Sequence, residues 1–508
     1  RPSARPLFGN RPALRLVKRS NMRNRLLALG LVTVAMPGIS AAAVEFCLEG
    51  EFDLGARYQG MQPRPGEFST ARWCVVTEDH SDRVFLSMSG KSNPDMNGNW
   101  AVAFLPPNLV RIVNANAPPD IEFRGGETLY EARRNRRIDP RRLVAELNEN
   151  PEWLRDSTLH GYTAVQYPGE SAPVDVTLQD GKLRTLRTTA DLPLRGRVAV
   201  IWRWDWSDQT APTLQIEVDN DVLFRAHGAW RETAGTVGLW QATPGVDPVE
   251  VPGANWPARV NMSLVELSPG VLLVQGVRTG FQHLVVQTDD GLVVADAPAG
   301  WVELHQIPPV DLVPGLGVSG LSEEFVDFLR AEFPDQKITA VALTHAHDDH
   351  AGGARAFAAA GAVVYAPAEL AEFLQSALNR DSMPADRLRG AGGEVRVVPV
   401  TEPITLGGTS RPVELLPLGT SPHTSSSLGV YVPEQGFFFQ SDLHVPRTES
   451  EHPRAARAVT ECWFAEWAVA NLPPVTVVVN THSAVQTPVS RLAKYLESDL
   501  CLRATVEP

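Results

Sequence analysis

The sequence is short of positive charge and of long apolar runs, and each shortage argues against a class of protein. Its 46 lysines and arginines face 59 aspartates and glutamates, so the formal net charge is -13. Nucleic-acid binding needs a basic footprint, so no nucleic-acid partner is expected. Beyond the N-terminal segment, no stretch is long and apolar enough to span a membrane. The 508 residues, 43% hydrophobic and 21% charged, are otherwise typical of a globular protein with two or three domains.

Cysteine is also scarce, with Cys47 and Cys74 early in the chain and Cys462 and Cys501 late. Four cysteines allow three connectivities. We expect pairing within each half, which closes two loops of moderate length, and four free buried thiols are the alternative. None of the cysteines lies beside the histidine cluster described below, so they are not expected to bind a metal.

The N-terminus reads as a targeting segment. A basic stretch at Met22 precedes eleven apolar residues and then the small residues "SAAA". We therefore expect residues 22–43 to be a secretory signal peptide, with residues 1–21 an upstream extension that is not structured. No lipobox precedes Cys47. The protein is expected to be periplasmic or secreted, where disulfides persist.

Residues 45–257 have the pattern of a mainly antiparallel β domain, whose role the sequence does not indicate. Stretches such as "GRVAVIWRWDW" alternate apolar and polar residues, and "QDGK" predicts a hairpin turn. Trp202, Trp204 and Trp206 share one strand face. This row predicts packing within the sheet, with a stacking platform for a sugar or aromatic ligand as the alternative. A Pro- and Gly-rich stretch from Ala242 is the expected linker.

From about Val260 the pattern changes, and residues 260–508 are expected to form a second domain. Strands come first, and then helices and strands alternate. A helix is expected over 321–333 with Ser322 as its N-cap, followed by a buried strand over 337–343. This order predicts an α/β architecture in which loops at strand ends carry function.

The loop after that strand holds an unusual density of metal-binding side chains. "THAHDDHAGG" places His345, His347, Asp349 and His350 between a strand end and a helix start. Neutral imidazole and carboxylate are the usual ligands of divalent cations such as zinc. Two histidines spaced by one residue can project to the same side of a loop. Because Asp349 and His350 then face a neighbouring position, the pattern fits two metals better than one.

This motif, with its Gly-Gly and helix, resembles that of the metallo-β-lactamase superfamily, over roughly residues 260–508. The further positions of the family pattern are filled in order: Asp296 in "GLVVADAP", His423 in "GTSPHTSSS", Asp442 in "GFFFQSDLH" and His482 in "VTVVVNTHS". The resemblance implies an αββα sandwich with one or two metals at the sheet edge.

The resemblance also implies roles for single residues. His345, His347 and His423 would bind the first metal, Asp349, His350 and His482 the second, and Asp442 would bridge both. Two zinc ions are expected, although this ligand set also accepts iron or manganese.

Three further side chains are given supporting roles. Asp296 would orient a metal ligand through a hydrogen bond. Asp349 could also transfer a proton. His444, two residues beyond Asp442, could orient substrate or protonate a leaving group, with a structural histidine as the alternative.

The sequence departs from relatives at three points. Residues 421–427 lack the glycine-flanked "GHTxG" of glyoxalase-II-like members, and Ser441 stands before Asp442 where glycine is usual. These two departures weaken assignment to the glyoxalase branch. The absence of a cysteine ligand separates the chain from the common lactamase class.

The expected function is that of an exported dinuclear hydrolase. A metal-bridging hydroxide would attack an ester, lactone, lactam or similar small-molecule bond. Alternatives are a β-lactamase or phosphodiesterase with the same site, an iron-dependent oxidoreductase of the same fold, and an envelope binding module with a vestigial site. The sequence fixes neither the substrate nor the oligomeric state.

Overall fold

The structure, a computed structural model, describes residues 43–53, 68–78, 81–89, 98–105, 109–114, 121–124, 139–155, 163–165, 174–208, 210–233, 249–250, 262–277, 281–299, 317–446, 456 and 459–504. The expected upstream extension lies outside these residues, as do the expected signal peptide apart from Ala43 and most of the expected linker. The chain from Ala42 onward forms one compact unit. None of the described helices has the length and apolarity needed to cross a bilayer.

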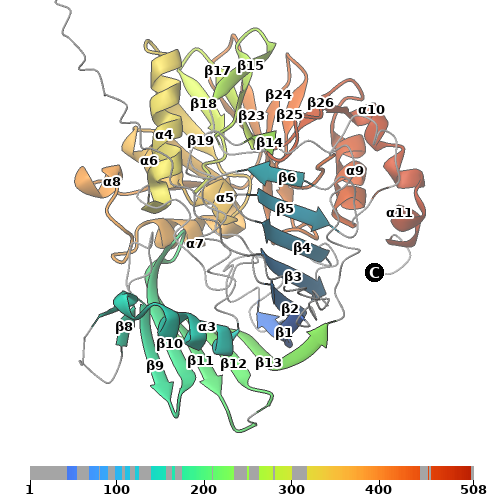
Figure 1. The fold of residues 1–508 in the computed structure, drawn as a ribbon. Helices are drawn as coiled ribbons and strands as arrows, with labels where there is room; N and C mark the ends of the chain where they lie inside the picture. The colour runs from blue at the N-terminus through green and yellow to red at the C-terminus, as the bar shows by residue number, and fades with distance from the viewer. Residues whose placement is uncertain are drawn as a thin grey trace, which may run out of the picture. The chain divides into compact units, whose positions relative to one another are not determined.

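The N-terminal region forms a 14-stranded sheet (Figure 1), which confirms the expectation of a largely antiparallel β region. Among the strands that the structure describes in this sheet, only β14 and β6 pair in parallel. In sheet order the strands are β14 (Val249–Glu250), β6 (Ile121–Arg124), β5 (Leu109–Asn114), β4 (Gly98–Leu105), β3 (Ser81–Ser89), β2 (Phe68–Glu78), β1 (Ala43–Asp53), β13 (Asp221–Thr233), β12 (Thr213–Val218), β11 (Gly196–Asp205), β10 (Lys182–Leu192), β9 (Val174–Gln179), β8 (Thr163–Val165) and β7 (Leu154–Arg155).

Alternating side chains decide which face of this sheet is buried. Trp202, Trp204 and Trp206 are 0%, 3% and 4% exposed, so they pack inside and cannot form a stacking platform for a ligand. The indole of Trp206 donates a hydrogen bond to the carbonyl of Leu183 at 2.7 Å. Between β9 and β10, Asp180 and Gly181 both have positive φ, as the predicted hairpin turn requires.

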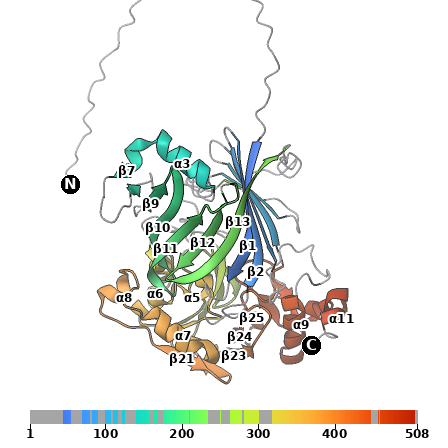
Figure 2. The ribbon, with the colours of Figure 1, turned by 90° about the horizontal axis from the view of Figure 1, so that it is seen from below.

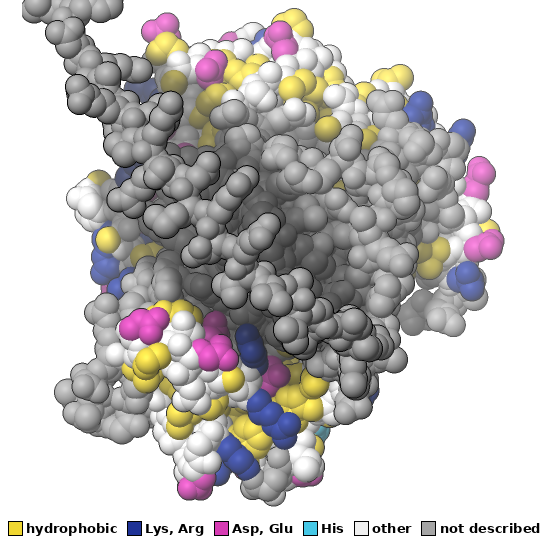
Figure 3. Space-filling view, in the orientation of Figure 1, with side chains coloured by type: hydrophobic (Ala, Val, Ile, Leu, Met, Phe, Trp, Pro, Cys, Tyr) yellow, Lys and Arg dark blue, Asp and Glu magenta, His cyan; other side chains and the backbone are white. Residues whose placement is uncertain are grey.

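The outer positions of the same strands carry charge of both signs. The Arg203 and Glu217 side chains pair at 2.9 Å, and those of Arg197 and Asp191 pair at 2.8 Å. Figure 3 shows basic and acidic side chains interspersed over the region of these strands. Helix α3 (Pro140–Glu149) begins at its N-cap Asp139 and lies beside β10 (Figures 1 and 2). Charges of both signs therefore alternate on the exposed face of these strands.

Two mixed sheets make up the C-terminal region. The seven-stranded sheet consists of β15 (Ser263–Ser268), β16 (Val271–Gln275), β17 (Gln282–Gln287), β18 (Leu292–Ala295), β19 (Ile338–Ala342), β20 (Val363–Pro367) and β21 (Val397–Val400). The six-stranded sheet consists of β22 (Ile404–Leu406), β23 (Val413–Gly419), β24 (Ser427–Val432), β25 (Phe437–Phe439), β26 (Val477–Val479) and β27 (Thr487–Pro488).

Helices accompany each of these sheets (Figure 1). The segments near the seven-stranded sheet are α4 (Gly317–Glu332), α5 (Asp348–Ala351), α6 (Ala354–Ala359), α7 (Ala368–Leu378) and α8 (Arg387–Gly390). Those near the six-stranded sheet are α9 (Val459–Asn471), α10 (Val489–Leu492) and α11 (Asp499–Ala504). The 3-10 turns are η2 (Pro151–Trp153) and η4 (Tyr495–Glu497).

Strand β18 shows why both faces of the seven-stranded sheet are apolar. Leu292 and Val294 belong to the core that includes α4, α6 and α7, whereas Val293 and Ala295 belong to the core shared with the six-stranded sheet. A third core joins the six-stranded sheet to α9, α10 and α11. Strands buried on both faces read as continuous apolar runs, as "GLVVA" does.

The turn between β10 and β11 enters the first of these cores. Leu194, 4% exposed, clusters with side chains of α4 and α6. The backbone NH of Arg197 donates to the carbonyl of Ser382 at 2.6 Å, and the hydroxyl of Ser382 donates to the carbonyl of Arg195 at 3.3 Å. A Cβ on Gly352 would lie 2.8 Å from the Cβ of Pro193. The N-terminal sheet therefore contributes to the core of the C-terminal region.

The disulfide expectation is confirmed, and one helix boundary is corrected. Cys47 pairs with Cys74 and Cys462 with Cys501, one bond in each half of the chain. Helix α4 begins at Gly317, so Ser322 is not its N-cap but lies inside it. The Ser322 hydroxyl instead donates to the carbonyl of Pro298 at 2.6 Å.

Candidate metal centre

The loop after β19 carries the first part of the site. Its backbone is fixed by Asp296, which is 0% exposed and follows the neighbouring strand β18. The Asp296 carboxylate accepts hydrogen bonds from the backbone NH and the hydroxyl of Thr344, at 2.8 and 2.9 Å. It also lies 2.9 Å from Nδ1 of His350. Asp296 thus orients both the start of the loop and the ring of His350, as the sequence predicted.

Close packing beneath the loop depends on two glycines. A Cβ on Gly353 would lie 2.2 Å from the Ser322 hydroxyl oxygen, and one on Gly352 would lie 2.6 Å from the Asp348 carbonyl oxygen. Neither space admits a side chain. Asp348, which had no assigned role, accepts a backbone hydrogen bond from Ala299 at 3.0 Å through that carbonyl.

The later site residues, His423, Asp442 and His482, lie in three separate loops. These loops follow strands β23, β25 and β26 of the six-stranded sheet. The hydroxyl of Ser421 accepts a hydrogen bond from the backbone NH of His423 at 3.2 Å. The side chain of Gln440 accepts backbone hydrogen bonds from Leu443 and His444, at 2.7 and 3.1 Å, so it fixes the turn that follows Asp442. Local hydrogen bonds therefore fix the backbone at His423 and directly after Asp442.

Gln282, the first residue of strand β17, forms hydrogen bonds to the backbone of the loop that carries His482. The backbone NH of Gln282 donates to the carbonyl of Thr481 at 2.8 Å, and its side-chain amide donates to the carbonyls of Asn480 and Ser483. The ring of Phe281 meets His482 edge-on, with centroids 4.5 Å apart. Sequence reasoning missed these contacts, because no local pattern links residues 198 and 201 positions apart.

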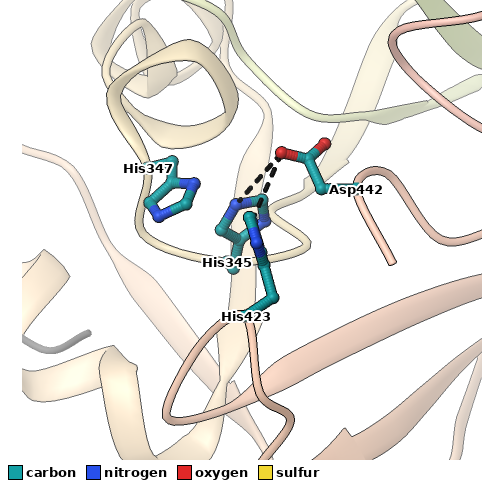
Figure 4. A group of neighbouring side chains, drawn as sticks. All are labelled: His345, His347, His423 and Asp442. Carbon is teal, nitrogen blue, oxygen red and sulfur yellow. Dashed lines mark ion pairs between the residues drawn. The ribbon is translucent and has the colours of Figure 1, made fainter. Parts of the chain in front are cut away.

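The structure brings all seven predicted ligands together, in two groups. Figure 4 shows the first group, with three imidazoles and one carboxylate facing one another. Within each group, one ligand atom from each residue lies within 4.8 Å of the others. The first group is His345, His347, His423 and Asp442, and the second is Asp349, His350 and His482.

Asp442 lies between the two groups, with one oxygen toward each. Its Oδ2 lies 3.4 Å from Nε2 of His423 and 3.9 Å from Nε2 of His345. Its Oδ1 lies 3.0 Å from Nε2 of His482 and 3.2 Å from Nε2 of His350. This is the arrangement that a carboxylate needs to bridge two cations.

The ionisation of the site suits cation binding. Burial lowers the pKa of His345 and His347 well below the ordinary value, and neighbouring imidazoles lower it further, so both rings are neutral. Burial opposes the ionisation of Asp442, but His350 and His482 outweigh it and hold the pKa of Asp442 well below its usual range. Burial likewise opposes the ionisation of Asp349, but His350 outweighs it and lowers the pKa of Asp349.

His350 behaves differently, because carboxylates surround it. Burial opposes its protonation, but Asp349, Asp442 and Asp296 outweigh burial and raise the pKa of His350 well above the ordinary value. In the metal-free protein, the proton on Nε2 of His350 therefore supplies the positive charge that a bound cation would supply. Metal binding at Nε2 displaces such a proton.

Orphaned nitrogens provide the test of fit for a metal. Nε2 of His345, His350 and His423 is buried and has no hydrogen-bond partner within the described part of the chain. Buried polar atoms are normally hydrogen-bonded, so imidazole nitrogens that converge on a carboxylate without a hydrogen bond are typical of a cation site. The residues therefore fit divalent metals at both groups.

His444 lies among structural contacts. Its ring is 1% exposed, Nε2 lies 3.2 Å from the Thr487 hydroxyl, and the ring stacks on Phe464 and meets Tyr495 edge-on. Its Nδ1 lies 3.8 Å from a carboxylate oxygen of Glu461. These contacts favour the alternative of a structural histidine over the predicted catalytic role.

Comparisons with known proteins agree with the fold in the C-terminal half. Residues 319–482 match the family model described as the Metallo-beta-lactamase superfamily. No curated protein shows a significant match to the chain.

Solved structures give further similarities. A metallo-beta-lactamase from Pontibacter korlensis is 18% identical, with 48% of this chain and 99% of that chain covered and a TM-score of 0.33. The mono-zinc form of the metallo-beta-lactamase FIM-1 from Pseudomonas aeruginosa is 14% identical, with 50% and 99% covered and a TM-score of 0.33. A double mutant of the sec-alkyl sulfatase PisA1 is 16% identical, with 46% and 40% covered and a TM-score of 0.31. The match of residues 319–482 to this family model supports a metallo-β-lactamase fold in the C-terminal half of the chain.

Proposed function

We propose that this protein is an exported, dinuclear metal-dependent hydrolase that cleaves an ester, lactone, lactam or similar bond of a small molecule. We also propose that its C-terminal layers form the αββα sandwich of the family. One observation carries the dinuclear assignment: the two oxygens of Asp442 face two separate groups of ligands. The pairing of both cysteine pairs supports export, because disulfides persist in oxidising compartments.

The ligand groups would hold two divalent cations, zinc being the expected metal. Such a pair, when bound, supplies a water of lowered pKa and an electrophile for the oxygen of the scissile bond. Three imidazoles and a shared carboxylate leave the first group with less negative charge than the second, which adds Asp349. With less anionic charge around it, a cation in the first group would be the stronger Lewis acid, and the nucleophilic hydroxide would be shared by both cations.

Asp349 remains our candidate for proton transfer. Its Oδ2 lies 3.4 Å from Nε2 of His350 and 3.7 Å from Nε2 of His482, so it stands inside the second group. Its low pKa keeps it ionised and able to accept a hydrogen bond from a bound water. A mononuclear iron oxidoreductase would not need this complete second group.

The test joins metal analysis to a substrate panel. We expect two metals per chain in purified wild-type protein, and hydrolysis of at least one class among lactams, lactones, esters, thioesters and phosphodiesters. His347→Ala and Asp442→Ala should each lose more than about 100-fold in kcat/KM, because even partners that only orient a metal ligand are worth 10- to 100-fold. His227→Ala, at an exposed histidine of β13, is the matched control and should retain activity. Full activity of His347→Ala would refute the proposal.

A further inference from the structure

Ser441, directly before the central carboxylate Asp442, combines strain with burial. Its φ is +68°, in the left-handed region that disfavours any residue with a Cβ, and its side chain is 0% exposed. Glycine would adopt this backbone without strain. A strained residue that persists at a site indicates that its side chain has a use there.

The hydroxyl of Ser441 connects the proposed ligands of the second group. It donates a hydrogen bond to Oδ1 of Asp442 at 2.9 Å, and Oδ1 is the oxygen that faces His350 and His482. The same hydroxyl oxygen lies 2.9 Å from Nδ1 of His350 and 3.3 Å from the hydroxyl of Thr481. One buried group therefore touches α5, the end of β25 and the loop after β26.

One assignment of hydrogens satisfies the contacts of Ser441 with Asp442 and His350 together. The hydroxyl has one hydrogen, which goes to Asp442. The hydrogen on Nδ1 of His350 then lies between Asp296 and the oxygen of Ser441, each 2.9 Å away. With Nδ1 keeping that hydrogen, a cation bound in the second group would meet the lone pair of Nε2, in place of the second ring proton. Glycine at this position would remove one hydrogen bond from Asp442 and leave His350 with one acceptor fewer.

We propose that Ser441 is a positioning residue that sets the affinity of the second metal subsite, by fixing the carboxylate of Asp442 and the tautomer of His350 together. This inference rests on the proposed dinuclear function. It gives a reason for serine at position 441, where relatives usually have glycine. It concerns the binding of divalent cations, so it can be measured without knowing the substrate.

Two substitutions at Ser441 separate the hydroxyl from the strain. Ser441→Gly removes the hydroxyl and relieves the backbone, so the metal-free protein should melt at the same or a higher temperature. Ser441→Ala removes the hydroxyl and keeps the strain. Both should bind the second Co²⁺ about 10- to 100-fold more weakly than wild type while the first stays near its wild-type affinity. The readouts are Co²⁺ absorption in titrations against a competing chelator, and melting of the metal-free protein.

A buried serine whose hydroxyl donates to a backbone carbonyl and to none of the proposed ligands provides the control. Ser322 is 0% exposed, and its hydroxyl donates to a backbone carbonyl, so Ser322→Ala should lower the melting temperature and leave both Co²⁺ affinities unchanged. A merely structural role for Ser441 would give the same pattern as this control.

The outcomes distinguish the two proposals. Two bound Co²⁺ in wild type, with the second weakened in both Ser441 variants, supports the inference. Two bound Co²⁺ in wild type with unchanged affinities in both variants overturns it while leaving the dinuclear function standing. A single Co²⁺ in wild type overturns the dinuclear function and the role of Ser441 with it.

Discussion

Truncation of Leu194 tests whether the N-terminal sheet is part of the metal-binding module or a separable binding domain. Leu194 is 4% exposed and packs in the core that holds α4 and α6, beside the helix that carries His350. Removing a leucine side chain from such a core costs about 2–5 kcal/mol. Its φ of +59° adds a second expectation, because alanine keeps the strained Cβ and glycine relieves it. We therefore expect Leu194→Gly to be no more destabilising than Leu194→Ala, the reverse of the order at an ordinary buried site.

The assay follows unfolding in urea by loss of bound Co²⁺ absorption, which reports on the C-terminal region alone. Leu194→Ala should lower the urea midpoint of that transition. The matched control is Leu178→Ala, on β9 of the same sheet, where the side chain is 46% exposed and a change within about 0.5 kcal/mol is expected. An unchanged Co²⁺ transition in Leu194→Ala would refute the reasoning and favour a separable N-terminal domain.

Three further predictions concern the site and its surroundings. Asp442→Asn should weaken both metals in competition titrations, because it contacts both groups. Asp296→Asn should weaken the second metal about 10- to 100-fold, since it removes the carboxylate that orients His350, and an unchanged affinity would contradict that role. Burial lowers the pKa of His283 from 6.5 to about 4, so between these pH values the unfolded chain binds a proton that the folded chain does not. Stability should therefore fall by about 3 kcal/mol as pH drops from 6.5 to 4, and His283→Leu should show that much less pH dependence in urea titrations.

The local elements could be predicted because each follows from a short-range pattern. Alternation predicts β11 and β12, and the apolar run before "THAHDDH" predicts β19. The hairpin turn at Gly181 follows from its residue types. The seven candidate ligands could be named because a spaced motif fixes four of them and the family pattern orders the rest. The structure places their side chains in two neighbouring groups.

Other features depend on contacts between distant residues and left no local signal. "LPLRG" reads as an ordinary turn, and nothing in it shows that Leu194 enters a core whose other buried residues start at Val274. The start of α4 was placed too late, because Ser322 has the chemistry of an N-cap while its hydroxyl in fact bonds to Pro298. Two further contacts join residues far apart in the sequence. Gln282 bonds to the backbone of the His482 loop, and the hydroxyl of Ser441 contacts His350.

The ligands also have a consequence for how long the folded chain survives. Four of them follow β19 of one sheet, and His423, Asp442 and His482 follow strands of the other, so bound cations would tie the two sheets together. A ligand present at 100 times its dissociation constant adds about 2.7 kcal/mol to folding. Under the proposed function, the supply of metal therefore governs resistance to proteolysis. The metal-free chain separates more often between its two sheets, and a protease degrades it sooner than the metal-bound chain.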